Sequence, residues 1–117
     1  MSVYDRAHEL AMAVRESEEY REYDRARRGI AAAETARSIL RDYRMAQLEV
    51  QAFRLSGKEP PEAKLKDLER LSGIVELHKP IIDFLRAEGR LLTLVGDIQK
   101  ILGDALDLWD YGEGSGK

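Results

Sequence analysis

The sequence predicts an all-α protein, a helical bundle of about five helices with a long helical hairpin and a long C-terminal helix. Three observations lead to this fold class. Proline occurs only at Pro60, Pro61 and Pro80, so long windows are free of the residue that most strongly interrupts helices. Inside these windows apolar residues recur with a period near 3.6, the period of an amphipathic helix. No stretch alternates apolar and polar residues as a half-buried strand would.

The first helix is expected over about residues 2–14. Val3, Ala7, Leu10 and Val14 fall on one face of it. These residues lie three or four positions apart, which is the spacing that places side chains on one side of a helix.

Ser17 is expected to cap a second helix, because its hydroxyl can accept a backbone N–H of the first turn. The two glutamates that follow lie at the positive end of the helix dipole. Tyr20, Tyr23 and Ile30 mark the buried side of this helix, and it is expected to weaken near Gly29.

The third helix is expected over about residues 34–56, and it carries two apolar stripes. Gly57 is well placed as a left-handed C-cap, and the prolines that follow prevent the helix from continuing. The stripes lie nearly opposite each other at 100° per residue. The first consists of Ala36, Ile39, Leu40, Tyr43, Ala46, Val50 and Phe53, and the second of Met45, Leu48, Ala52 and Leu55.

The fourth helix is expected over about residues 61–77, with Leu65, Leu68, Leu71 and Val75 directed inward. It should fold back on the third as a helical hairpin. The last helix is expected over about residues 80–108, and its apolar residues cover about half of its circumference, more than an ordinary surface helix shows. They are Phe84, Ala87, Leu91, Leu94, Val95, Ile98, Ile101, Leu102, Ala105 and Trp109.

Three glycines on the last helix, Gly89, Gly96 and Gly103, repeat every seven residues along one edge of the apolar face. Each costs about 1 kcal/mol of helix propensity relative to alanine. Glycines at this spacing would let another helix approach closely. Three tolerated surface glycines explain the pattern equally well, and both interpretations stay open.

Composition indicates one soluble, folded domain. The chain has 117 residues, of which 44% are hydrophobic and 35% charged, and its net charge is -3. The excess positive charge of a general nucleic-acid binder is missing. We expect a single domain over residues 1–110 and a flexible tail over residues 111–117. The absence of cysteine, of a signal-peptide core and of an apolar run long enough for a membrane favours a cytoplasmic protein.

No catalytic or metal-binding constellation is found, so we expect no enzyme activity and no cofactor. His8 and Glu9 are adjacent and do not face each other on a helix. His78 lies at a helix junction, where it can cap carbonyl groups. The basic cluster at residues 25–28, with Arg25, Arg27 and Arg28, closely follows acidic residues and is best explained as a solvated face. An RNA-binding helical module that uses this cluster is the alternative.

The second stripe of the third helix and the wide face of the last helix both require a partner, because a folded monomer rarely leaves a large apolar patch in water. A second copy of the chain, related by a two-fold axis, is the simplest partner. We therefore expect a homodimer. Its interface should use Met45, Leu48, Ala52 and Leu55, with the edge of Gly89, Gly96 and Gly103 as the second candidate.

Three segments of the chain occur in the order YDRAHELAMAVRESEEYREYDRAR, DYRMAQLEVQAFRLSGKEPPE and FLRAEGRLLTLVGDIQKILGDALDL. Through them nearly the whole chain resembles the YlbF/YmcA family of Bacillus-type bacteria, which includes YheA. It implies a small, all-helical, dimer-forming regulator without enzymatic activity. YlbF and YmcA act with YaaT on RNase Y and mRNA processing, and they affect competence, sporulation and biofilm formation.

The resemblance also implies protein partners, either YlbF/YmcA-type paralogues in a heteromer or RNase Y. Some members of that complex help to bind iron–sulfur clusters through cysteines. The present chain has no cysteine and departs from that pattern. A YheA-like paralogue of unassigned role is therefore as good a match as a true YlbF.

Overall fold

The computed structural model describes residues 2–108, and within them it contains five helices and no strand. The expected all-α fold class is confirmed. The helices are α1 (Val3–Arg15), α2 (Glu18–Ala31), α3 (Glu34–Leu55), α4 (Glu62–Glu76) and α5 (Lys79–Leu106). Trp109 and the predicted tail at residues 111–117 lie outside the described residues.

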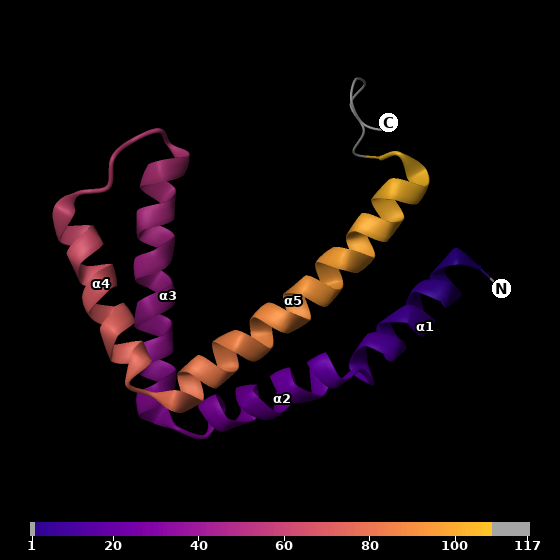
Figure 1. The fold of residues 1–117 in the computed structure, drawn as a ribbon, viewed down its shortest axis with the longest axis horizontal. Coiled ribbons are helices and arrows are strands. Elements are labelled where there is room, and N and C mark those ends of the chain that lie inside the picture. The colour runs from indigo at the N-terminus through magenta and orange to yellow at the C-terminus, as the bar shows by residue number, and fades with distance from the viewer. Residues whose placement is uncertain (1, 109–117) are drawn as a thin grey trace.

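The helices form two arms that meet at a vertex (Figure 1). One arm is the hairpin of α3 and α4. The other consists of α5 with α2 beside its first half, and α1 continues outward from α2. The connections α2–α3 and α4–α5 both lie at the vertex, and from there the arms diverge like the sides of a V. The molecule extends 50 × 38 × 20 Å.

The main core lies at the vertex, where α2, α3, α4 and α5 contribute one or two buried residues each. Ile81 is fully buried there, and the ring of Phe84 lies 5.6 Å from the ring of Tyr23. The guanidinium of Arg44 lies 5.7 Å from the centre of the Phe84 ring, so one side chain of α5 contacts both α2 and α3. The buried members of this cluster are Ile30, Ala36, Val75, Ile81 and Phe84.

The hairpin arm has its own packed seam. Ala46 and Val50 of α3 and Leu71 of α4 are buried in it. Lys64 of α4 donates to Glu49 of α3 at 3.1 Å. The predicted first stripe of α3 and the predicted hairpin are therefore both present.

Gly57 ends α3 in the way that its sequence position predicts. Its φ of 77° is left-handed, which glycine adopts without steric cost. The N–H of Gly57 donates to the carbonyl of Arg54 at 3.0 Å, and the N–H of Lys58 donates to that of Phe53 at 2.9 Å. This is the hydrogen-bond pattern of a Schellman motif.

Ser17 links α1 to α2. Its hydroxyl donates to the carbonyl of Val14 at 2.6 Å and accepts the backbone N–H of Tyr20 at 3.2 Å. One side chain thus satisfies a carbonyl at the end of α1 and an amide at the start of α2. The predicted cap is confirmed.

Ser17→Ala is expected to lower the free energy of unfolding by about 1 kcal/mol, because the amide and the carbonyl both lose their partner. Urea unfolding at fixed protein concentration measures the loss. Ser72→Ala, in the middle of α4, is the control and should leave stability unchanged or slightly raised, since alanine favours helix. Equal stability of the two variants would show that the Ser17 cap contributes nothing.

Two expectations about local structure need correction. The second helix does not weaken at Gly29 but continues to Ala31, because Ile30 is anchored in the vertex core. Leu65 is 37% exposed rather than fully inward. It lies in the first turn of α4, next to the loop that connects α3 to α4 and away from the vertex core (Figure 1).

Candidate functional site

The α3 stripe, which we define as Met45, Leu48, Ala52 and Leu55, is exposed to solvent. The exposed fractions of its three large side chains are 54% for Met45, 61% for Leu48 and 80% for Leu55. Ala46 and Val50, which lie on the other side of the same helix, are buried against the hairpin seam. The structure thus leaves this second face of α3 uncovered within one chain. Whether it forms an interface stays a prediction.

A second exposed apolar row lies on the distal half of α5. Near the vertex Glu88 accepts a hydrogen bond from Arg44 of α3 at 2.7 Å. From the vertex outward α5 and α3 diverge (Figure 1). Residues spaced by three, seven and four positions then fall on one side of the helix and are exposed. We call them the α5 stripe, and they are Leu92, Val95, Leu102 and Leu106.

The first helix adds a third apolar surface. It packs closely with α2 and with no other described helix. Val3, Tyr4, Leu10 and Met12 are consequently exposed. The small size of the protein does not by itself explain why these side chains are exposed. The apolar face of α1 has the periodicity of a helix that packs against a neighbour.

The glycine edge, predicted as the second contact surface, is only partly open. Gly89 and Gly96 are exposed, and a Cβ atom at either position would meet nothing within 4 Å. Gly103, in contrast, is buried. At Gly89 and Gly96 no other described helix makes the close approach that glycine would permit, and the role of the edge remains a prediction.

Sequence reasoning missed Leu92 and Leu106. They belong to a row with Leu85 and Gln99 in which positions recur every seven residues. This heptad spacing is the signal that could have found them. The broad apolar face of α5 hid this spacing, because the face gave no sign of which of its residues are buried and which are exposed.

A groove lined by both apolar and charged residues lies between α2 and α5, and sequence reasoning missed it as well. Its volume is about 930 Å³. Arg90 of α5 forms an ion pair with Glu22 of α2, with 2.6 Å between a guanidinium nitrogen and a carboxylate oxygen. Arg25 and Arg86 also line the groove. Two helices that are far apart in the sequence contribute these charges, so no local motif marks the groove.

The basic cluster at residues 25–28 is largely neutralised. Arg27 and Arg28 both pair with Asp24, the latter at 2.9 Å. The hydrogen bond from Arg27 holds the pKa of Asp24 below its ordinary value of 3.8, so the carboxylate stays charged at neutral pH. This pairing leaves only Arg25 of the cluster without an acidic partner among residues 2–108, and it does not favour the RNA-binding alternative.

The two histidines have different surroundings. His8 is exposed on α1. His78 precedes α5, and its Nδ1 lies 2.9 Å from the carbonyl oxygen of Ile74, so it caps the end of α4 as expected. Within residues 2–108 no three His, Asp or Glu side chains gather into a group able to hold a metal ion. None of the helices in this part of the chain has the length and apolar character that a membrane crossing requires.

The fold and its surfaces define a small all-α protein in which two helical arms share one core and expose apolar faces. The chain belongs to the YlbF/YmcA family, because the family model described as "Control of competence regulator ComK, YlbF/YmcA" matches residues 3–107. The expected family membership is thereby confirmed, and the regulatory class that the resemblance implied is supported.

Among curated relatives, a UPF0342 protein of Symbiobacterium thermophilum is 41% identical over 106 residues, which cover 91% of this chain and 95% of that protein. Two solved structures share the fold. A DUF964 protein of unknown function from Bacillus stearothermophilus has a TM-score of 0.75 and 18% identity, with 90% of this chain and 92% of that chain covered. Bacillus subtilis RicA, solved in complex with RicF, has a TM-score of 0.63 and 20% identity, with 90% and 93% covered.

Proposed function

We propose that the chain is a non-enzymatic regulatory adaptor that forms a homodimer through the α3 stripe, with the glycine edge as a second contact. The observation that carries this proposal is the exposure of apolar side chains on both arms. Leu48 and Leu55 on α3 and Leu92 and Leu106 on α5 are all more than half exposed. Water disfavours such surfaces, and a second chain would cover them.

The size of the exposed surface supports the same proposal. The accessible surface of the chain is 8905 Å², whereas a compact monomer of this mass exposes about 6,500 Å². The radius of gyration is 18.6 Å, against about 13 Å for a compact domain of this length. A stable interface buries about 800 Å² on each partner, and obligate dimers bury more. The excess of accessible surface over that of a compact monomer is therefore large enough for the interface of an obligate dimer.

A function that depends on assembly with other proteins also agrees with the descriptions of the relatives. The family is described as a regulator of competence, and RicA was solved in complex with RicF. We propose that this chain, as a single domain over residues 1–110, likewise acts through protein partners in the cytoplasm. These partners are a YlbF/YmcA-type paralogue and RNase Y. The assembly would influence mRNA processing and, through it, competence, sporulation and biofilm formation.

Binding to RNase Y tests this function directly. Purified RNase Y from the same host, titrated onto the immobilised chain, is expected to bind in a saturable way and with a fixed ratio of chains. The variant Leu48→Glu/Leu55→Glu should lose this binding if RNase Y recognises the assembled form. Absence of saturable binding, with the chain shown to be folded and assembled, would contradict the RNase Y part of the proposal and leave the assembly itself standing.

A further inference from the structure

Small residues and arginines of both helices line the groove between α2 and α5. Ala26 and Gly29 of α2 and Ala87 and Gly89 of α5 line it. A Cβ atom at Gly29 or Gly89 would meet nothing within 4 Å, so there is free space directly above the backbone of both helices. An extended or helical segment can therefore come close to the two helices here.

The charges of the groove are not balanced. Arg90 pairs with Glu22 at 2.6 Å, and Asp83 accepts a hydrogen bond from Lys79 at 2.8 Å. Both carboxylates that line the groove are thus already paired. Arg25 and Arg86 line it too, and neither pairs with a carboxylate among residues 2–108. Two guanidinium groups, one on each helix, are left free to bind an acidic ligand.

We infer that this groove binds an acidic segment of a partner protein, with carboxylates of that segment paired to Arg25 and Arg86. This inference rests on the proposed adaptor function and specifies the chemistry of one partner. Guanidinium groups present their donors in a planar fork that matches a carboxylate.

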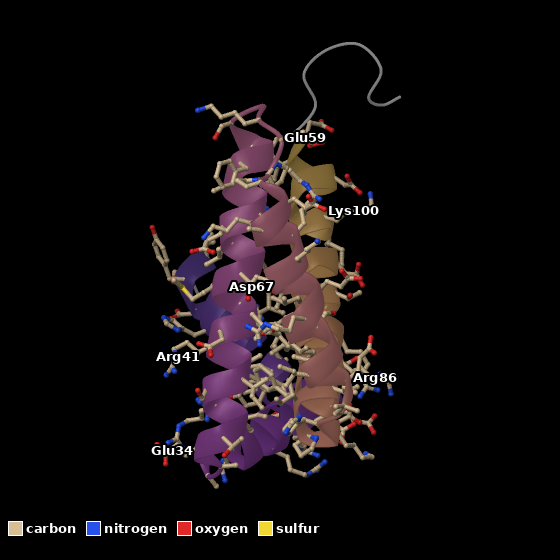
Figure 2. All side chains as sticks on the ribbon, turned by 90° about the vertical axis from the view of Figure 1, so that its left-hand side faces the viewer. Glu34, Arg41, Glu59, Asp67, Arg86 and Lys100 are labelled. Carbon is tan, nitrogen blue, oxygen red and sulfur yellow. The ribbon has the colours of Figure 1, made fainter. Side chains whose placement is uncertain are left out.

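A peptide fits the groove better than a nucleic acid does. Glu22 and Asp83 lie among the arginines and would repel a continuous row of phosphates. The backbone N–H groups of a peptide can instead face these carboxylates. The net charge of -3 also opposes nucleic-acid binding. Arg86 and Arg41 project from opposite edges of the molecule (Figure 2). A segment bound at Arg86 therefore leaves the side of the hairpin that carries Arg41 free.

The charge requirement is tested with a fluorescein-labelled oligoglutamate peptide and the full chain. We expect saturable binding that weakens with added salt, and no binding of an oligoglutamine peptide of equal length. Arg25→Gln/Arg86→Gln should weaken oligoglutamate binding about tenfold, since each lost pair contributes up to about 1 kcal/mol. Arg41→Gln/Arg54→Gln removes the same charge from the other arm and should change affinity less than about twofold.

The space requirement is tested without a change of charge. Gly29→Gln places a side chain in the groove, and nothing in the fold obstructs it. This substitution is expected to weaken binding of the oligoglutamate peptide about as much as Arg25→Gln/Arg86→Gln does. Gly73→Gln, at an equally open position on α4, is the matched control and should leave affinity unchanged. Circular dichroism confirms that each variant keeps its helix content.

Three results would overturn the inference. These are no binding of oligoglutamate, equal weakening by the groove and control variants, or preferential binding of single-stranded oligouridine in the groove. The molecular mass of every sample is measured in parallel. A dimer without peptide binding contradicts the groove inference alone, whereas a monomer contradicts the proposed assembly, so the two failures are distinguishable.

Discussion

Replacing Leu48 and Leu55 together by glutamate is expected to convert the proposed homodimer into monomers. Both leucines are more than half exposed in one chain, so the substitutions remove little packing from the protomer itself. In the dimer each leucine would contribute about 1.5–3 kcal/mol by burial, and a glutamate there would have to lose its hydration. We therefore expect the dissociation constant to rise by at least about a hundredfold.

Analytical ultracentrifugation over a range of protein concentrations measures this change. Gln47→Glu/Gln51→Glu adds the same two charges to α3 at exposed polar positions outside the α3 stripe, and it should remain dimeric. Circular dichroism should show full helix content in both variants. A Leu48→Glu/Leu55→Glu protein that stays dimeric would place the interface elsewhere, and the glycine edge of α5 would be the next surface to test.

Phe84→Ala is expected to lower the free energy of unfolding by about 3–5 kcal/mol, the usual cost of deleting a buried aromatic ring. The ring lies in the vertex core, packs with Tyr23 of α2 and lies beneath the guanidinium of Arg44 of α3. Together with Ile30, Ala36, Val75 and Ile81 of the same core, the ring holds the two arms against each other. The variant should therefore lose the fixed orientation of the arms as well as stability.

Urea unfolding at a fixed protein concentration measures the loss, because the stability of a dimer depends on concentration. Leu77→Ala is the control. Leu77 is 82% exposed at the end of α4, and its removal should change stability by no more than about 0.5 kcal/mol. If Phe84→Ala were as stable as Leu77→Ala, the vertex could not be the main core of the protein.

Much of the fold could be predicted because helix signals are local. Ser17, Gly57 and the prolines act through their own backbone or their nearest neighbours, so each marks a helix end without knowledge of the rest of the chain. Each of the five helices begins and ends within one or two residues of the predicted position, except α2, whose full length was not foreseen at Gly29. There a tertiary contact of Ile30 outweighs the low helix propensity of glycine.

The arrangement of the arms could not be predicted in the same way. An apolar stripe on a helix shows that something covers it, but not whether that is the same chain or another. The exposure of the α3 stripe agrees with its position opposite Ala46 and Val50. Leu92 and Leu106 were not assigned to any surface, because nothing in the sequence states that α5 and α3 diverge from the vertex. The groove is even harder to predict from the sequence, because Arg25 and Arg86 come to line the same groove only in the folded protein.

The mass of the purified, unmodified chain in solution tests the central claim most directly. Sedimentation equilibrium at micromolar concentration is expected to give twice the 13.3 kDa of a single chain. Dilution should lower the measured mass toward that of one chain only at concentrations far below the micromolar range, because the exposed apolar surface is large. A mass of one chain at every concentration would contradict the account, because the exposed faces of α3 and α5 would then be stable in water without a second copy.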